Sequence, residues 1–214
     1  IVSRLSHELN VPEIASRILT ARGIFEPGPA LKFLNPNLSD LFDPFQLSQM
    51  DLAIERVIQA LKANEKMMIY GDYDVDGITG TALMFLVLNR LGADVSYYLP
   101  NRLVEGYGIS EDGLQEAEKR KINLLISVDC GITAVDEVET ARRMGIDCIV
   151  TDHHEPGDRI PVANAIVNAK LDGATSPGFE LSAVGVAYKF AQALYRKLGQ
   201  DETELEQHLD LVAL

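Results

Sequence analysis

The sequence predicts an α/β protein, a mostly parallel open sheet with helices on both faces, preceded by a short helical N-terminal segment. From about residue 47, short apolar runs typical of buried strands alternate with longer segments in which apolar residues recur at helical spacing. The connections are short, as in sheets whose parallel strands are joined by crossover helices. With 214 residues, 47% of them hydrophobic, the chain can bury one large core or two small ones.

Residues 1–46 are expected to form the helical N-terminal segment, because helical spacing follows Pro12 and later prolines divide the rest into short pieces. Residues 47–214 are expected to form the α/β domain. Its strands are expected at 66–72, 94–100, 123–129, 147–152 and 164–169. Its helices are expected at 49–65, 77–91, 110–121, 134–145, 182–199 and 202–214, with a loop at 101–108. In the first helix, the apolar face is expected to consist of Leu52, Ile54, Val57, Ile58 and Leu61.

The net charge is −13, from 19 basic and 32 acidic residues. Such a balance argues against broad electrostatic adhesion to nucleic acid or to anionic membranes. It leaves a phosphate substrate open, because bound divalent cations reverse the local field. The nature of the site therefore decides the substrate class.

No apolar run is long enough for a membrane span, and the first residues lack the pattern of a signal peptide. Cys130 and Cys148 sit among apolar residues without a Cys-x-x-Cys spacing. We therefore expect buried free thiols in a reducing, cytoplasmic protein.

Acidic and histidine residues follow three of the expected strands. Asp72, Asp74 and Asp76 follow the first strand, Asp129 ends the third, and Asp152, His153 and His154 end the fourth. Ligands of such sheets bind at the carboxyl ends of the strands. We expect these side chains to converge on one rim of the sheet.

Five carboxylates and two imidazoles at one rim are unfavourable unless cations hold them together. Mixed oxygen and imidazole ligands suit Mn²⁺; Mg²⁺ is an alternative, and Zn²⁺ or Fe²⁺ could compete. Two metals about 3.5–4 Å apart form the clamp used for in-line phosphoryl displacement. Asp129, alone on its strand, is best placed to bridge them. No Ser or Cys has a nucleophile-elbow setting, which argues against a covalent intermediate.

Each motif also has a structural interpretation. The alternating aspartates could form a solvated turn or a helix cap, Asp129 could cap the next helix, and the histidine pair could be surface or core. A nucleotide-binding turn is a further alternative, but the segment lacks both glycine-rich fingerprints and is acidic.

The segment 101–108 offers two substrate contacts. Arg102 could clamp a phosphate or a strand terminus, and Tyr107, between two glycines, could stack on a base. An ion pair of Arg102 with Glu105 and a tyrosine packed on the turn are the alternatives.

The segments "YGDYDVDGITG", "SVDCGI", "TDHHEPG" and "VGVAYKFAQAL" occur in this order between residues 70 and 194. Together they resemble the DHH phosphoesterase superfamily, and within it the single-strand-specific exonucleases. The resemblance implies a hydrolase: a two-metal, usually Mn²⁺-dependent nuclease that degrades single-stranded DNA from its 5′ end in repair and recombination. It also implies a monomer that works with single-strand-binding protein and a helicase.

Carried over by motif, Asp74 and Asp76 resemble ligands of separate metals, Asp129 the bridging ligand, and His153 a further ligand. His154 resembles the residue that contacts the substrate phosphate and assists catalysis. Asp152 resembles the carboxylate that orients an imidazole, and Asp72 a ligand or an outer carboxylate. The loop at Arg102 resembles a region near the 5′ phosphate.

The family continues past Leu214 into a segment with another aspartate ligand and into further domains. Residues 47–214 are therefore expected to be the N-terminal part of the catalytic core, with weak activity on their own. Two alternatives share the motifs: a DHH phosphodiesterase or phosphatase for short oligonucleotides or cyclic dinucleotides, and a non-catalytic DNA-binding scaffold. A scaffold is expected to have lost metal ligands, whereas this chain retains them.

Overall fold

The computed structural model describes residues 1–214, which divide into two compact units, Ile1–Asp43 and Pro44–Leu214. The division lies near the boundary expected after residue 46. The first unit contains α1 (Val2–Leu9), α2 (Glu13–Ala21), α3 (Pro27–Leu34) and the 3₁₀ turn η1 (Leu38–Asp40). Leu5, Leu19 and Ala30 form its small core. Arg4 links its first helix to the turn before α3, because its guanidinium donates to the Phe25 carbonyl and the Glu26 carboxylate.

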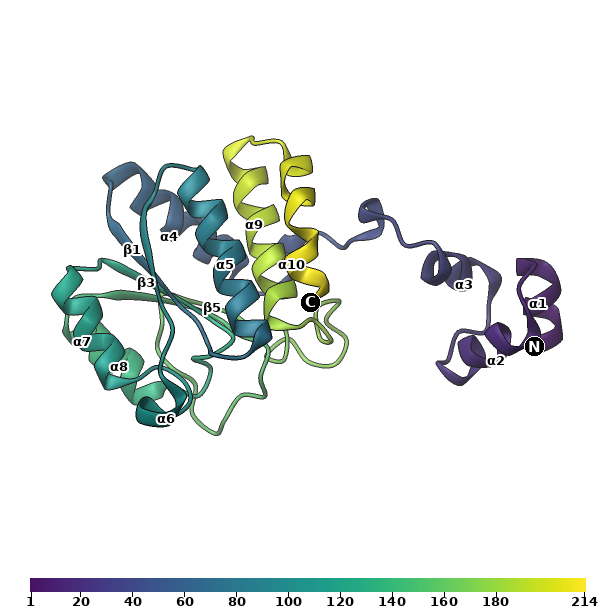
Figure 1. The fold of residues 1–214 in the computed structure, drawn as a ribbon, viewed down its shortest axis with the longest axis horizontal. Helices are drawn as coiled ribbons and strands as arrows, with labels where there is room; N and C mark the ends of the chain where they lie inside the picture. Colours follow the sequence, from purple (N-terminus) through teal and green to yellow (C-terminus); the bar gives the residue numbers. More distant parts are fainter. The chain divides into compact units, whose positions relative to one another are not determined.

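The second unit is built on a five-stranded sheet with the order β2-β1-β3-β4-β5. All neighbouring strands are parallel, so their carboxyl ends lie at one rim. The parallel α/β fold predicted from the alternating pattern is therefore confirmed (Figure 1). The strands are β1 (Lys66–Tyr70), β2 (Asp94–Tyr98), β3 (Leu124–Val128), β4 (Asp147–Thr151) and β5 (Ala165–Val167).

Helices cover both faces of the sheet (Figure 1). On one face, α7 (Glu111–Arg120) and α8 (Val135–Arg143) bury residues such as Leu114 and Val138 against the strands. On the other face lie α4 (Met50–Ala63), α5 (Val75–Arg90) and α9 (Ala183–Leu198). The remaining elements are η2 (Pro44–Gln46), α6 (Arg102–Glu105), η3 (Glu202–His208) and α10 (Leu209–Ala213).

The structure corrects several details. Leu52 is 50% exposed, so its assignment to the buried face of α4 is wrong; Met50, Ala53 and Ala60 are buried instead. The segment expected as a loop contains the short helix α6, and residues 202–208 form a 3₁₀ helix rather than an α-helix. Short polar turns carry little periodicity, which explains the errors in the last two elements.

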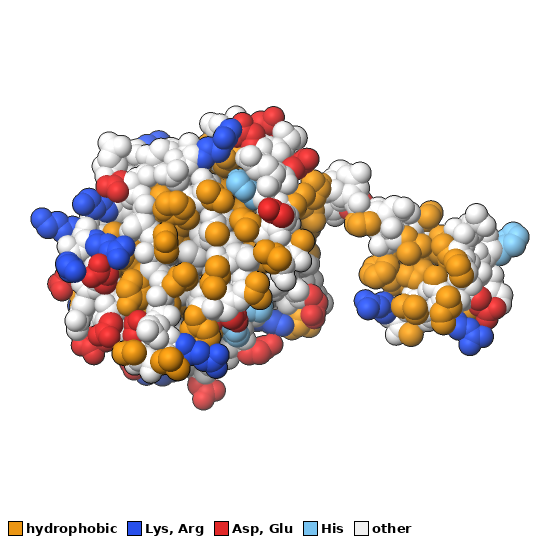
Figure 2. All heavy atoms as spheres, in the orientation of Figure 1, with side chains coloured by type: hydrophobic (Ala, Val, Ile, Leu, Met, Phe, Trp, Pro, Cys, Tyr) orange, Lys and Arg blue, Asp and Glu red, His pale blue; other side chains and the backbone are white.

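Cys130 and Cys148 are buried free thiols, as expected. None of the helices has both the length and the apolar character that a bilayer crossing requires. Lysine and arginine side chains gather beside the C-terminal end of α7, around Lys66 and Arg120 (Figure 2). Basic residues are favoured there because this end of the helix is the negative end of its dipole. The acidic residues of interest lie at the opposite ends of the strands.

Candidate metal centre

The turn between β1 and α5 carries the three alternating aspartates. Asp72 is buried, and one of its carboxylate oxygens, Oδ1, has no hydrogen-bond partner. Asp74 is the N-cap of α5, because its Oδ1 accepts a hydrogen bond of 3.1 Å from the Gly77 N–H. A Cβ atom on Gly77 would lie 2.7 Å from the Asp72 backbone, so glycine permits this tight turn. The cap interpretation thus holds for Asp74, but not for Asp72.

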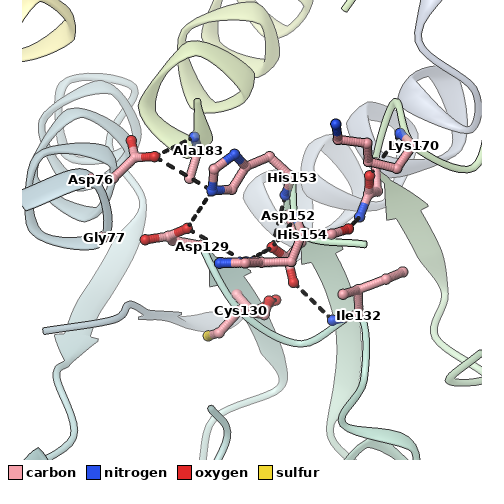
Figure 3. Close-up of polar contacts among 12 residues, drawn as sticks. Asp76, Gly77, Asp129, Cys130, Ile132, Asp152, His153, His154, Lys170 and Ala183 are labelled. Atoms are coloured by element: carbon pink, nitrogen blue, oxygen red, sulfur yellow. Dashed lines mark hydrogen bonds and ion pairs between the residues drawn. The ribbon is translucent and has the colours of Figure 1, made fainter. Parts of the chain in front are cut away.

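Asp76 lies in the first turn of α5 and points toward the start of α9 (Figure 3). Its two carboxylate oxygens accept hydrogen bonds of 2.7 Å from the N–H groups of Ala183 and Val184. The same carboxylate lies 3.6 Å from His153 Nε2. The positive end of the α9 dipole therefore compensates the charge of Asp76.

Asp129 follows β3 with a left-handed backbone, φ 66°, and only 1% of it is exposed. Its Oδ1 has no hydrogen-bond partner, although His153 Nε2 lies 3.2 Å away. Burial raises the pKa of Asp129 to about 6; His153 opposes this shift, while the charges of Asp76 and Asp74 add to it. Helix α8 begins after Ala134 without a side-chain cap, so the interpretation of Asp129 as a cap is wrong.

Asp152 uses both carboxylate oxygens within the protein. Oδ1 accepts from the N–H groups of His153 (2.7 Å) and His154 (3.1 Å) and lies 2.8 Å from His154 Nδ1. Oδ2 accepts from the Ile132 N–H at 2.9 Å. Burial alone would raise the pKa of Asp152, but the hydrogen bonds from His154 and Ile132 hold it below its usual value. This carboxylate is placed to orient His154 rather than to bind a metal.

His154 is held on its Nδ1 side. Besides Asp152, the Tyr107 hydroxyl lies 3.2 Å from this nitrogen, and the two rings meet edge to face with centroids 5.8 Å apart. The same hydroxyl donates to the Asp129 carbonyl at 3.3 Å. The short contact with Asp152 raises the pKa of His154 and assigns a proton to Nδ1, leaving Nε2 as the free nitrogen.

Arg102 lies 4.7 Å over the Tyr73 ring. Glu105 instead accepts hydrogen bonds from the Asn101 N–H and the Tyr98 hydroxyl, so the alternative of an Arg102–Glu105 ion pair is wrong. Burial raises the pKa of Asp72, and the positive charge of Arg102 is among the effects that oppose this rise. Arg102 therefore stands beside the first aspartate of the turn.

Two sets of three potential ligands share Asp129. One consists of Asp72, Asp74 and Asp129, the other of Asp129, His153 and His154, with ligand atoms within 4.8 Å of one another in each. Burying carboxylate oxygens without partners is costly, and both Asp72 and Asp129 have such an oxygen. A pair of divalent cations that share Asp129 would satisfy them. Asp76, expected as a ligand, lies outside both sets, and both of its carboxylate oxygens accept hydrogen bonds from the first N–H groups of α9.

The fold also brings in groups that the sequence did not reveal. These are the backbone N–H groups of Ile132, Ala183 and Val184, which carry no residue-specific signal, and Asn168, whose side chain donates to the His154 carbonyl at 3.0 Å. Asn168 directly follows β5, and a polar residue at the carboxyl end of a parallel strand is the feature that could have indicated its place in the site.

The parallel α/β fold with acidic and histidine side chains at the carboxyl ends of its strands is the setting of the match: the chain belongs to the DHH family, whose N-terminal domain matches residues 66–214. The chain is 43% identical over 213 residues to the single-stranded-DNA-specific exonuclease RecJ of Bacillus subtilis, covering 100% of this chain and 26% of that protein.

Solved structures of RecJ share the fold. An exonuclease RecJ bound to manganese matches with a TM-score of 0.73 and 34% identity, over 81% of this chain and 43% of that one. RecJ from Thermus thermophilus in complex with Mn²⁺ matches with a TM-score of 0.79 and 29% identity, over 99% of this chain and 29% of that one. The chain spans about a quarter to just over a third of the length of the curated relatives it matches first.

Proposed function

We propose that this chain is the phosphoesterase core of a 5′→3′ exonuclease that hydrolyses the phosphodiester bonds of single-stranded DNA with two Mn²⁺ ions. Mg²⁺ is the alternative metal. The observation that carries the proposal is Asp129, whose buried oxygen lacks a hydrogen-bond partner and belongs to both ligand sets. The RecJ relatives, named as single-stranded-DNA-specific exonucleases, support the substrate class.

The geometry supports the following assignment of roles. Asp72, Asp74 and Asp129 would hold one ion, and Asp129 with His153 the other; His154, the third member of the second set, is assigned to the substrate. When bound, such a pair lowers the pKa of a water molecule and neutralises charge on the reacting phosphate. Asp76 lies 3.6 Å from His153 Nε2, so it positions this imidazole and could become a ligand if its contacts with α9 rearranged.

We assign to His154 the role of acting on the substrate. Asp152 and Tyr107 hold its Nδ1 side, so that Nε2 faces outward. From this position, Nε2 can contact a phosphate oxygen and assist proton transfer to the departing 3′ oxygen. Asp152 stabilises the positive charge that the imidazole acquires when it is protonated. Arg102, beside the Tyr73 ring, is available for a terminal 5′ phosphate.

We infer that the protein acts as a cytoplasmic monomer in DNA repair and recombination, with single-stranded DNA as its substrate. We propose a helicase that unwinds duplex DNA and single-strand-binding protein as its partners. Other DHH functions remain as competitors. A phosphodiesterase for short oligonucleotides or cyclic dinucleotides would use the same residues, whereas a DNA-binding scaffold would not need the ligand sets.

A comparison of Asp129→Asn with the wild-type protein tests the proposal. Asp136, 83% exposed and paired with Arg159, provides the matched control Asp136→Asn. We expect wild type and control to release mononucleotides from a 5′-labelled single strand with Mn²⁺, and Asp129→Asn to release none. Cleavage of short dinucleotides alone would favour the small-substrate enzyme, and DNA binding without cleavage the scaffold. Undiminished cleavage by Asp129→Asn would contradict the shared-ligand role.

A further inference from the structure

The strand order places cations on both sides of the acidic centre. Because the order is β2-β1-β3-β4-β5, Arg102 follows one edge strand and Lys170 follows the other. The aspartates and histidines come from the three strands between them. Neighbouring strands are about 4.8 Å apart, so the two edges lie about 19 Å from each other. A polyanion lying across this rim would meet a cation on either side of the metal centre.

Lys170 shares a cavity of about 300 Å³ with His153 and His154. Only 18% of its side chain is exposed, and its ammonium lies 3.7 Å from the centroid of the Phe179 ring. In Figure 3 it lies on the opposite side of the histidines from Asp76. The cavity is therefore continuous with the candidate centre and has a largely buried cation in its wall.

The segment that carries Lys170 is tied to the histidine segment. Asn168 accepts a hydrogen bond of 2.9 Å from the Lys170 N–H and donates to the His154 carbonyl at 3.0 Å. The side chain of Lys170 is packed on Phe179. These contacts fix the cation relative to His154, which is what a phosphate-positioning group requires.

The contacts of the Lys170 ammonium leave N–H groups available for a further acceptor. Its acidic partner, Glu155, is 3.5 Å away and 77% exposed, which makes a weak, solvent-screened pair. The Phe179 ring attracts the charge but cannot accept conventional hydrogen bonds from all three N–H groups. A phosphate oxygen entering the cavity would supply the stronger acceptor.

We propose that Lys170 and its cavity bind a backbone phosphate of the DNA strand, on the side of the scissile bond opposite Arg102. This proposal rests on the proposed exonuclease function. If Arg102 meets the 5′ terminus, Lys170 contacts the chain that continues 3′ of the scissile bond. It is a substrate-binding residue for long strands, and a dinucleotide is too short to reach it.

The test compares Lys170→Met, which keeps the apolar stem on Phe179 but removes the charge, with Lys170→Arg and Lys197→Met. Lys197 is the matched control because it also pairs with a largely exposed glutamate, Glu55 at 3.7 Å. It lies in the last turn of α9, about 20 Å along the helix from the turn that contacts Asp76. For each protein we measure the affinity for single-stranded DNA at several salt concentrations, kcat/KM on a long strand and on a dinucleotide, and the affinity for Mn²⁺.

For Lys170→Met, we expect the slope of log affinity against log salt to become shallower by about 0.7, the loss of one phosphate contact. On a long strand, kcat/KM is expected to fall about tenfold. On a dinucleotide it stays unchanged, as does Mn²⁺ affinity. Lys170→Arg retains the wild-type slope, and Lys197→Met behaves as wild type.

Equal losses on both substrates with an unchanged salt slope would overturn the proposal, because Lys170 would then only support Phe179. Reduced Mn²⁺ affinity in Lys170→Met would overturn it as well, because the residue would then organise the metal centre. If the wild-type protein neither bound nor cleaved single strands, the exonuclease function itself would fail, and the Lys170 proposal with it.

Discussion

Asp152 Oδ1 lies 2.8 Å from Nδ1 of His154, and the Asp152 side chain is fully buried. This contact places the proton on Nδ1 of His154 and leaves Nε2 as the free nitrogen. It resembles the arrangement in which a carboxylate raises the basicity of an imidazole and locks its orientation.

Replacing Asp152 with Asn tests this relationship. An amide can present its NH₂ group to Nδ1, which would favour the opposite tautomer of His154. We expect kcat to fall about 10- to 100-fold, with a smaller change in Mn²⁺ affinity. Steady-state cleavage and calorimetric titration with Mn²⁺ measure the two effects, and Asp136→Asn is the control. A loss confined to metal affinity would show that Asp152 acts on the ion rather than on His154.

Tyr107 has two competing roles that one substitution separates. The sequence suggested stacking on a base, whereas the structure places the hydroxyl 3.2 Å from His154 Nδ1. Tyr107→Phe retains the ring, so stacking predicts wild-type KM and kcat. If the hydroxyl positions His154, kcat is expected to fall about tenfold while KM changes little. This change corresponds to about 1.4 kcal/mol, the size of the contribution of one hydrogen bond. Tyr107→Leu, which removes both features, completes the comparison.

The convergence of the acidic residues could be predicted because it depends on topology. Parallel strands place their carboxyl ends at one rim, so Asp72, Asp129 and Asp152 had to lie near one another once the strands were recognised. The individual roles depend on hydrogen bonds between distant segments. Asp76 accepts from the N–H groups of Ala183 and Val184, more than 100 positions away, and backbone donors leave no mark in a sequence.

Other features escaped prediction for related reasons. Lys170 lines a cavity with His153 and His154 because it follows β5, which lies next to β4 in a strand order that the sequence does not state. Tyr107 turns its hydroxyl toward Asp129 and His154 because of a compact turn between Gly106 and Gly108, both with positive φ. Periodicity detects elements of several turns, but it does not determine the direction of a side chain in such a turn.

Asp72 and Asp129 each bury a carboxylate oxygen without a hydrogen-bond partner, so we expect these residues to lower the stability of the metal-free protein. Without metal, Asp129→Asn replaces a buried charge by a neutral group of the same size. We expect it to raise the free energy of unfolding of the metal-free protein by about 1–3 kcal/mol. The wild-type protein is expected to gain stability on addition of Mn²⁺, and the variant to gain little.

Thermal unfolding in chelator and in Mn²⁺ measures both effects. Asp136→Asn, at an exposed position, is expected to leave both melting temperatures unchanged. A chelator-treated Asp129→Asn protein that is less stable than wild type would contradict the prediction, because the contact of Asp129 with His153, 3.2 Å away, would then outweigh the cost of burying the charge.

Glu105 is expected to stabilise the segment that carries Arg102 and Tyr107 at neutral pH, and to lose this effect in acid. Burial alone would raise the pKa of Glu105, but hydrogen bonds from Ser110, Asn101 and Tyr98 hold it below its usual value. A carboxylate whose pKa is lower in the folded state stabilises the fold above its unfolded pKa, about 4.3. That stabilisation is lost as the pH falls through the folded pKa.

Glu105→Gln therefore should lower the free energy of unfolding most at neutral pH, and the gap to wild type should narrow as the solution is acidified. Because Glu105 is partly exposed, we expect a difference under about 1 kcal/mol. Glu118→Gln, at an exposed position of α7, is the control and is expected to follow wild type. Urea unfolding at several pH values measures the gap. A gap that widens in acid would mean that the neutral carboxyl, rather than the carboxylate, holds Tyr98 and Ser110.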